Sequence, residues 1–141
     1  MKKLFTLLMA ICLIVGLLPV VASAAGTTAK ITFVGGEGSV TEKVEITEDG
    51  DPIYLVTDEG APYRQDANED NYNIKVEFVD GNPTIFLRGA DLKAPKDKMC
   101  INMATLGDDS LEYVIYTEEE SFLESNGNNT VRADSANMRV T

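Results

Sequence analysis

The sequence contains no histidine and no tryptophan among its 141 residues. Without histidine, the chain can form neither a Ser-His-Asp nor a Cys-His catalytic arrangement, and no zinc site that uses an imidazole ligand. Without tryptophan, it lacks the largest aromatic platform for stacking on a sugar or a nucleobase. These two absences exclude several common kinds of catalytic and binding site before any motif is considered.

Cysteine and positive charge are also scarce. The two cysteines are Cys12, within a long apolar run, and Cys100, which has apolar neighbours on both sides. We expect Cys100 to be a buried, unreactive thiol, because no second cysteine of the folded part could pair with it. Twelve basic residues face 23 acidic ones, for a formal net charge of −11. Such a surface repels nucleic acid and anionic lipid, so neither is an expected partner.

The first 24 residues have the organisation of a secretory signal peptide. Lys2 and Lys3 precede an apolar run over residues 4–21, and the small residues Ala22-Ser23-Ala24 follow as a cleavage site. We therefore expect residues 1–24 to be removed, leaving a secreted protein that begins at Ala25 and has no membrane anchor. Loss of the two lysines makes the mature chain more acidic still.

Residues 25–70 predict short β-hairpins followed by an acidic linker. Strands are expected at residues 30–34, around Val44 and Ile46, and at residues 53–56, and the turn-forming residues 48–52 predict a hairpin loop between the last two. Residues 57–71 are polar and without periodicity, which is typical of a linker.

The clearest strand pattern follows this linker. Tyr72, Ile74, Val76 and Phe78 alternate with polar residues, so they should share one buried face. Asp80-Gly81 predicts a tight turn, and residues 84–87 predict the next strand.

From Thr84 onward, short strands alternate with small polar corners, and some of them resemble each other. Residues 101–103 have a counterpart in residues 131–133, and residues 113–116 have one in residues 138–141, at offsets of up to 30 residues. Imperfect repeats of this length indicate one unit of chain per turn of a solenoid. A small β-sandwich with irregular hairpins is the alternative.

Residues 71–141 resemble secreted bacterial carbohydrate-binding-domain proteins that contain a right-handed parallel β-helix. The similarity rests on the strand, corner and isolated apolar residue in residues 84–95, and on the Asn- and Gly-rich corner at residues 125–130. The resemblance implies an all-β protein with the first coils of a right-handed parallel β-helix, which binds extracellular polysaccharide, often with calcium. It supplies no catalytic motif.

Two further expectations follow from this fold. A β-helix needs at least three stacked coils and a cap, whereas residues 138–141 read as a strand, so we expect further coils beyond residue 141. We also expect the open apolar edge of this last strand to make the chain self-associate.

Exposed tyrosines are the candidate sugar-stacking residues. Tyr63 lies beside Pro62 in the predicted linker, and Tyr113 and Tyr116 have opposite parities in one predicted strand, so one of the two should face outward. These three tyrosines are our predicted ligand-binding residues.

Clustered oxygen ligands suggest calcium as a cofactor. Asp66, Asn68 and Asp70 are spaced loosely like a calcium loop, without the glycine and the helix that an EF-hand requires. Packed carboxylates at the other predicted corners could also hold a cation, namely Asp108, Asp109, Glu118 and Glu120. We expect any binding to acidic polysaccharide to require a bridging calcium ion.

The sequence thus predicts a secreted, non-catalytic polysaccharide-binding or adhesion protein of the cell exterior. No pair of acidic residues is singled out as a catalytic pair, and no nucleophile with an adjacent base is recognisable. Two alternatives remain open. One is the N-terminal part of a β-helical polysaccharide lyase, and the other is a small structural β-sandwich of the cell surface.

Overall fold

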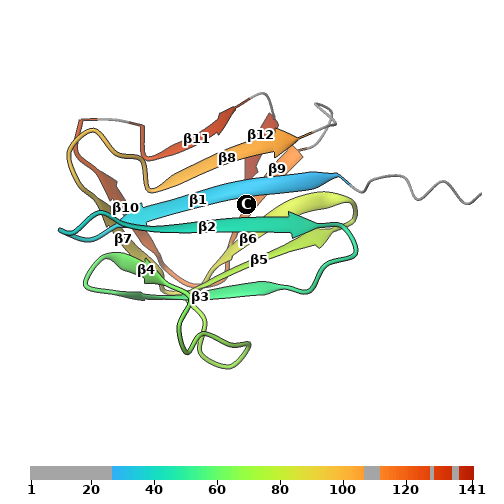
Figure 1. Ribbon diagram of the computed structural model, residues 1–141, viewed down its shortest axis with the longest axis horizontal. Coiled ribbons are helices and arrows are strands. Elements are labelled where there is room, and N and C mark those ends of the chain that lie inside the picture. The colour runs from blue at the N-terminus through green and yellow to red at the C-terminus, as the bar shows by residue number, and fades with distance from the viewer. Residues whose placement is uncertain (1–26, 107–111, 128, 135–136) are drawn as a thin grey trace, which may run out of the picture.

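The computed structural model describes residues 27–106, 112–127, 129–134 and 137–141. Over these residues the chain forms β-strands and no helix, arranged in three sheets (Figure 1), which confirms the all-β class. The strands are β1 (Thr28–Gly35), β2 (Val40–Thr47), β3 (Ile53–Asp58), β4 (Ala61–Tyr63), β5 (Ile74–Val79), β6 (Asn82–Leu87), β7 (Asp91–Ala94), β8 (Ile101–Leu106), β9 (Glu112–Thr117), β10 (Phe122–Ser125), β11 (Val131–Asp134) and β12 (Asn137–Val140). The predicted signal peptide lies outside the described residues.

The first six strands pair in an antiparallel manner. β1 pairs with β2, β3 with both β4 and β5, and β5 with β6. The predicted turn between β5 and β6 is confirmed, since Asp80 and Gly81 have φ angles of 50° and 78°, as a two-residue hairpin turn needs. The expected inward face of β5 is confirmed as well, because Ile74 and Val76 are fully buried.

Two expectations for the N-terminal region are wrong. Residues 48–52 do not close a hairpin, because β2 belongs to the four-stranded sheet and β3 to the six-stranded sheet. Residues 48–52 instead connect two sheets whose side chains meet in one core. The expected linker also contains a strand, β4, in which Ala61 is buried. Turn-forming residues mark where a strand ends, but they do not determine which strand becomes its neighbour.

The later strands pair in parallel, and the segments that resemble each other in sequence lie opposite each other. Ile101 of β8 lies opposite Val131 of β11, and Tyr113 of β9 lies opposite Met138 of β12. β6 pairs in parallel with β9, and β7 with β10. Each strand of one pass of the chain is therefore stacked on the corresponding strand of the next pass.

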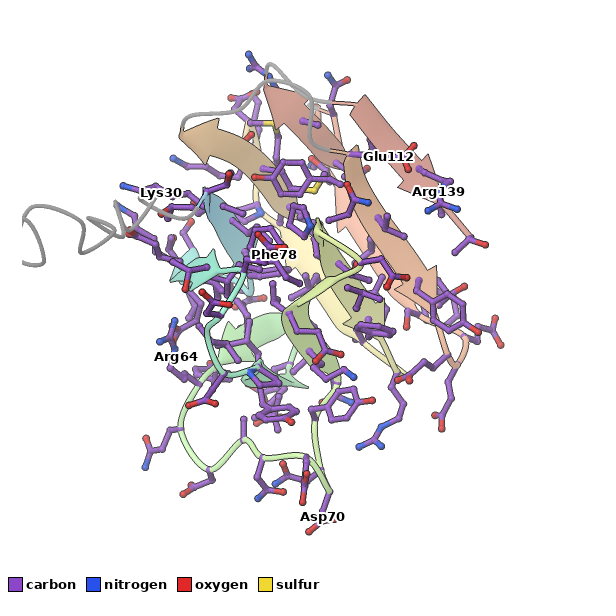
Figure 2. The ribbon with its side chains drawn as sticks, turned by 90° about the vertical axis from the view of Figure 1, so that its right-hand side faces the viewer. Lys30, Arg64, Asp70, Phe78, Glu112 and Arg139 are labelled. Atoms are coloured by element: carbon purple, nitrogen blue, oxygen red, sulfur yellow. The ribbon has the colours of Figure 1, made fainter. Side chains whose placement is uncertain are left out.

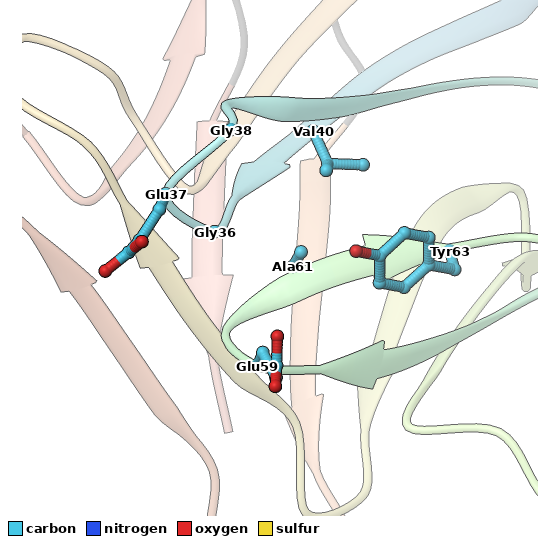
Figure 3. Close-up of a pocket in the computed structure, with 7 residues that line it drawn as sticks. All are labelled: Gly36, Glu37, Gly38, Val40, Glu59, Ala61 and Tyr63. Atoms are coloured by element: carbon cyan, nitrogen blue, oxygen red, sulfur yellow. The ribbon is translucent and has the colours of Figure 1, made fainter.

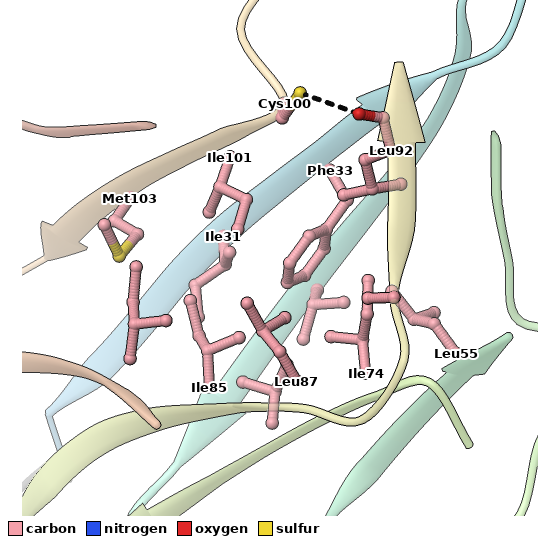
Figure 4. Close-up of a cluster of buried hydrophobic side chains, with 14 of the residues drawn as sticks. Ile31, Phe33, Leu55, Ile74, Ile85, Leu87, Leu92, Cys100, Ile101 and Met103 are labelled. Carbon is pink, nitrogen blue, oxygen red and sulfur yellow. Dashed lines mark hydrogen bonds between the residues drawn. The ribbon is translucent and has the colours of Figure 1, made fainter. Parts of the chain in front are cut away.

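All three sheets contribute to one hydrophobic core (Figure 4). The sheet orders are β11-β8-β1-β2, β12-β9-β6-β5-β3-β4 and β10-β7. Phe33 comes from the four-stranded sheet, Ile85 from the six-stranded sheet and Leu92 from the two-stranded sheet, and all three are fully buried. The core includes residues on both sides of residue 70, so the expected boundary there does not separate two cores.

Cys100 lies in this core, as expected. It is a free cysteine with no exposed surface, and its thiol is 3.0 Å from the Glu124 carbonyl oxygen and 3.5 Å from that of Leu92 (Figure 4). Burial raises the pKa of this thiol, which keeps it protonated and able to donate.

Within the part of the chain that the structure describes, no helix is long and apolar enough to cross a membrane.

Candidate functional site

A row of large side chains crosses the outer face of the six-stranded sheet. Tyr54 of β3 lies opposite Lys75 of β5, Lys75 lies opposite Phe86 of β6, and Phe86 lies opposite Tyr116 of β9. Residues opposite each other on paired strands point to the same side of a sheet. The strand neighbours of Lys75 point into the core, so this row faces outward. We call these four residues the outer row.

Direct contacts join the members of the outer row. The Lys75 ammonium lies 4.0 Å from the centre of the Phe86 ring and 2.7 Å from a carboxylate oxygen of Glu77. The rings of Phe86 and Tyr116 are 5.7 Å apart at 60°, in edge-to-face geometry. These cation–π and aromatic contacts hold the rings in place, while Tyr116 keeps 44% of its surface exposed. The row therefore presents an ordered aromatic surface to solvent.

The aromatic surface extends past Tyr54 to Tyr72. The two rings are 5.6 Å apart, and the Arg88 guanidinium lies 3.9 Å from the centre of the Tyr72 ring. Arg88 is fixed by a hydrogen bond of 3.1 Å from its Nε to the Tyr72 carbonyl oxygen. The Tyr72 hydroxyl donates to a carboxylate oxygen of Glu118 at 2.7 Å. This end of the surface is consequently rigid and charged.

The Tyr72 hydroxyl should titrate at a higher pH than an ordinary tyrosine. Burial, with the Glu118 hydrogen bond as the second cause, raises its pKa from 10.0 to about 12. The neutral hydroxyl therefore stabilises the fold below pH 10, and this stabilisation is lost as the pH rises towards 12. We expect the free energy of unfolding to fall by up to about 2 kcal/mol over this interval because of Tyr72.

The Tyr72→Phe variant is the control for this pH dependence. Its unfolding free energy should fall less between pH 10 and pH 12, and its tyrosinate absorbance should lack one titration step near pH 12. A variant that instead lacks a titration step near pH 10 would show that the Tyr72 hydroxyl titrates normally.

A shallow depression of about 250 Å³ lies beside the outer row. Its floor is formed by Thr84 and Val114, which are only 5% and 7% exposed although they point away from the core. Arg139 borders it and lies 3.1 Å from a Glu112 carboxylate oxygen, and Figure 2 shows this pair side by side on one edge of the sheet. The lining combines Phe86, Tyr116, Val79, Asp80, Asn82, Arg139 and Thr141 with the floor residues.

A second pocket, of about 530 Å³, lies between the β1–β2 turn and β4 (Figure 3). Tyr63, Val40 and Ala61 form its apolar part, and Figure 3 shows Glu59 beside Ala61 and Glu37 directed away from the tyrosine. Tyr63 is 38% exposed, but no second aromatic ring lines this pocket among the described residues. It therefore offers one stacking surface, whereas the outer face of the six-stranded sheet offers a connected set.

The structure separates the three predicted ligand-binding tyrosines. Tyr116 is exposed in the depression and Tyr63 in the second pocket, towards opposite edges of the six-stranded sheet. The prediction that Tyr113 is a ligand-binding residue is wrong, because Tyr113 is fully buried and its hydroxyl donates to the Ala104 carbonyl oxygen at 2.6 Å. One of the two tyrosines on β9, Tyr116, does face outward, as their opposite parities predicted.

The five predicted metal ligands that the structure describes form no cluster of acidic side chains. No three Asp, Glu, Cys or His residues form a metal-binding group within the described residues. Asn68 Oδ1 accepts the Asp70 amide within its own loop, at 2.9 Å. The Glu118 carboxylate accepts the Tyr72 hydroxyl, and Glu120 is exposed. Asp108 and Asp109 lie outside the described residues.

Sequence reasoning missed most of this aromatic surface. Lys75 stands at an outward position of the most regular alternation in the chain, which was a usable signal. Its alignment with Tyr54 and Phe86, however, depends on the pairing of β3, β5 and β6, which the sequence does not reveal. Tyr72 was expected to be buried, and it is, with 8% of its surface exposed, but it packs against Tyr54 and Arg88 and not in the main core.

Comparison with protein-family models gave no match, and searches of curated proteins and of solved structures gave none either.

Proposed function

We propose that this chain is a secreted, non-catalytic polysaccharide-binding or adhesion protein that binds glycan on the outer face of the six-stranded sheet. The observation that carries the proposal is the outer row, in which Tyr54, Lys75, Phe86 and Tyr116 are aligned across four strands. A sugar ring has an apolar face that stacks on an aromatic side chain and hydroxyls that need hydrogen-bonding partners. The depression combines both kinds of surface.

We further propose that the strands from β6 onward are the first coils of a right-handed parallel β-helix. The parallel pairing of Ile85 with Ile115 and of Ile101 with Val131 supports this, because a two-sheet sandwich is built from antiparallel strands. A right-handed path is the expected one, since crossover connections between parallel strands are right-handed in about 98% of cases.

The chemistry around the outer row favours a neutral or weakly acidic glycan. Lys75 and Arg139 are each paired with a glutamate, so they can donate hydrogen bonds without making the face strongly cationic. The formal net charge of −11 opposes the approach of a polyanion. A calcium ion between exposed carboxylates of the protein and those of an acidic polymer would offset this repulsion. Bridging of this kind is the one role that we propose for calcium.

Replacing Tyr116 by alanine should weaken glycan binding about fivefold. The loss of one stacking ring corresponds to about 1 kcal/mol. Phe86→Ala should have a similar effect, because it removes both a ring and the support for Tyr116. The measurement is calorimetric titration with a soluble neutral β-glucan and with polygalacturonate, each with calcium and with a chelator. Tyr63→Ala is the matched control, an equally exposed tyrosine outside the outer row.

Three outcomes would contradict the proposal in different ways. Binding lost in Tyr63→Ala but kept in Tyr116→Ala would move the site to the second pocket. Polygalacturonate binding unaffected by the chelator would remove the bridging ion. Release of unsaturated sugars would favour the rival hypothesis of a β-helical lyase.

A further inference from the structure

Tyr63 lines two hollows near the β3–β4 turn. One is the second pocket, of about 530 Å³ (Figure 3), and the other, which we call the third pocket, has a volume of about 390 Å³. Tyr63 is 38% exposed and is the residue that the two linings share. Pockets that hold small ligands have volumes of about 300–1,000 Å³, so each hollow has room for part of a ligand.

The two pockets have the same chemical character. Glu37 and Glu59 line the second pocket, Asp58 and Asp66 line the third, and all four side chains are exposed. No lysine or arginine of the described part of the chain belongs to either lining. Tyr63 is therefore an aromatic wall between two hollows that each carry negative charge and no positive charge.

The four carboxylates have no cationic partner within the described structure. None of them forms an ion pair with a described lysine or arginine. Two basic residues near the β3–β4 turn are paired elsewhere, since Arg64 lies 3.8 Å from a Glu42 carboxylate oxygen and Lys93 lies 3.6 Å from one of Asp91. The positive charge that these pockets lack can therefore come from a ligand.

Main-chain contacts hold the walls of the second pocket in place. Glu59 and Gly60 have φ angles of 48° and 77°, as a two-residue hairpin turn needs. Gly36 lies so near this turn that a Cβ atom built on it would be 2.7 Å from the Ala61 Cβ atom. The Gly36 amide donates to the Lys93 carbonyl oxygen at 3.0 Å, and the Lys93 amide donates to the Gly60 carbonyl oxygen at 2.9 Å. The pocket is therefore preformed, which lowers the cost of ordering it around a ligand.

We propose that the second and third pockets form one site for a linear aliphatic polyamine, which places an ammonium group in each pocket and its methylene chain along Tyr63. The tyrosine ring attracts an alkylammonium group through a cation–π contact, and Val40 and Ala61 add apolar surface. The formal net charge of −11 attracts a polycation. Two weak contacts made by one ligand reinforce each other, so a diamine should bind more tightly than a monoamine.

A calcium ion fits these pockets less well than an organic cation. No three acidic residues converge on one point within the described structure, whereas calcium takes six to eight oxygen ligands. An ammonium group needs only one or two carboxylates and keeps the rest of its hydrogen bonds with water.

Calorimetric titration of the protein with spermidine, cadaverine and pentylamine, at about 0.15 M salt, tests the proposal. Spermidine and cadaverine should bind about tenfold more tightly than pentylamine, which has a single ammonium group. Tyr63→Ala should weaken spermidine binding about fivefold, whereas Tyr63→Phe keeps the ring and should bind as the parent does. Tyr63 is exposed, so both variants should fold, and their melting temperatures check this.

Glu59→Gln and Asp66→Asn each remove one carboxylate, the first from the second pocket and the other from the third. Each should weaken spermidine binding about threefold, as expected for an exposed ion pair, and the two together about tenfold. Glu45→Gln is the matched control, because it removes the same charge outside both pockets, where Glu45 lies 3.7 Å from Lys30. We expect this control to bind spermidine as the parent does.

Four results would overturn the proposal. Equal affinities for cadaverine and pentylamine would show that no ligand spans the two pockets. Equal losses in Glu45→Gln and Glu59→Gln would reduce the effect to the overall charge of the protein. Calcium binding tighter than spermidine binding would indicate a metal site, and binding of an oligolysine peptide without binding of spermidine would indicate a protein partner. Tyr116→Ala, which measures glycan binding, should leave spermidine binding unchanged, so this proposal and the proposed function are tested separately.

Discussion

Replacing Gly35 by alanine should lower the free energy of unfolding by about 3 kcal/mol and the melting temperature by about 10 °C. A Cβ atom at this position would lie 2.0 Å from the Gly60 carbonyl oxygen and 3.2 Å from the Ala61 Cα atom. These neighbours are main-chain atoms, so no side chain can rotate away to make room. Thermal or denaturant unfolding, followed by circular dichroism, measures the effect.

The cost is large because Gly60 cannot move freely. Its carbonyl oxygen accepts the Lys93 amide, which fixes the β3–β4 turn against β7. A shift of this turn would break that hydrogen bond and expose the main chain of β7.

Gly38→Ala is the matched control in the same turn region. No atom lies within 4 Å of a Cβ built at Gly38, and its φ is not positive. We expect a change of less than about 0.5 kcal/mol, or a slight stabilisation from the reduced freedom of the unfolded chain. Equal stability of the Gly35→Ala and Gly38→Ala variants would show that the two turns do not approach each other this closely.

Replacing Tyr113 by alanine should cost about 4 kcal/mol of stability, the range typical of a large aromatic residue removed from a core. Tyr113 is the largest of the fully buried side chains. It comes from β9 of the six-stranded sheet, and its hydroxyl donates to Ala104 of β8 in the four-stranded sheet. The variant therefore loses both packing and a link between two sheets. Chemical denaturation measures the effect.

Tyr116→Ala is the control within the same strand. Because Tyr116 is exposed, its removal should cost less than about 1 kcal/mol of stability, while it weakens glycan binding as described above. The Tyr113→Ala substitution should thus lower the stability of the protein, whereas the Tyr116→Ala substitution should mainly weaken glycan binding. A Tyr113→Ala variant as stable as the Tyr116→Ala variant would contradict the buried position of Tyr113.

The tertiary structure assembles the candidate site from strands that are distant in sequence. Tyr54 and Tyr116 belong to the same outer row although 61 residues of chain lie between them. The alternation in β5 showed that Lys75 would point outward, yet not which aromatic ring would lie beside it. The candidate calcium ligands Asp70 and Glu118 were grouped because both belong to acidic segments of the sequence. In the fold, Asp70 lies in a loop in which its amide donates to Asn68, whereas the Glu118 carboxylate accepts the Tyr72 hydroxyl.

The sequence by itself determined the all-β class, the inward face of β5, the turn at Asp80-Gly81 and the similarity between the segments that become β8 and β11 and between those that become β9 and β12. These features are local or repeat at a fixed offset, so side-chain alternation and self-similarity are sufficient to read them. Only the tertiary structure decided that β2 and β3 lie in different sheets, that Tyr113 rather than Tyr116 is buried, and that an aromatic row forms across four strands. Each of these depends on which strands become neighbours, and strand pairing is set by the packing of the whole core rather than by any one segment.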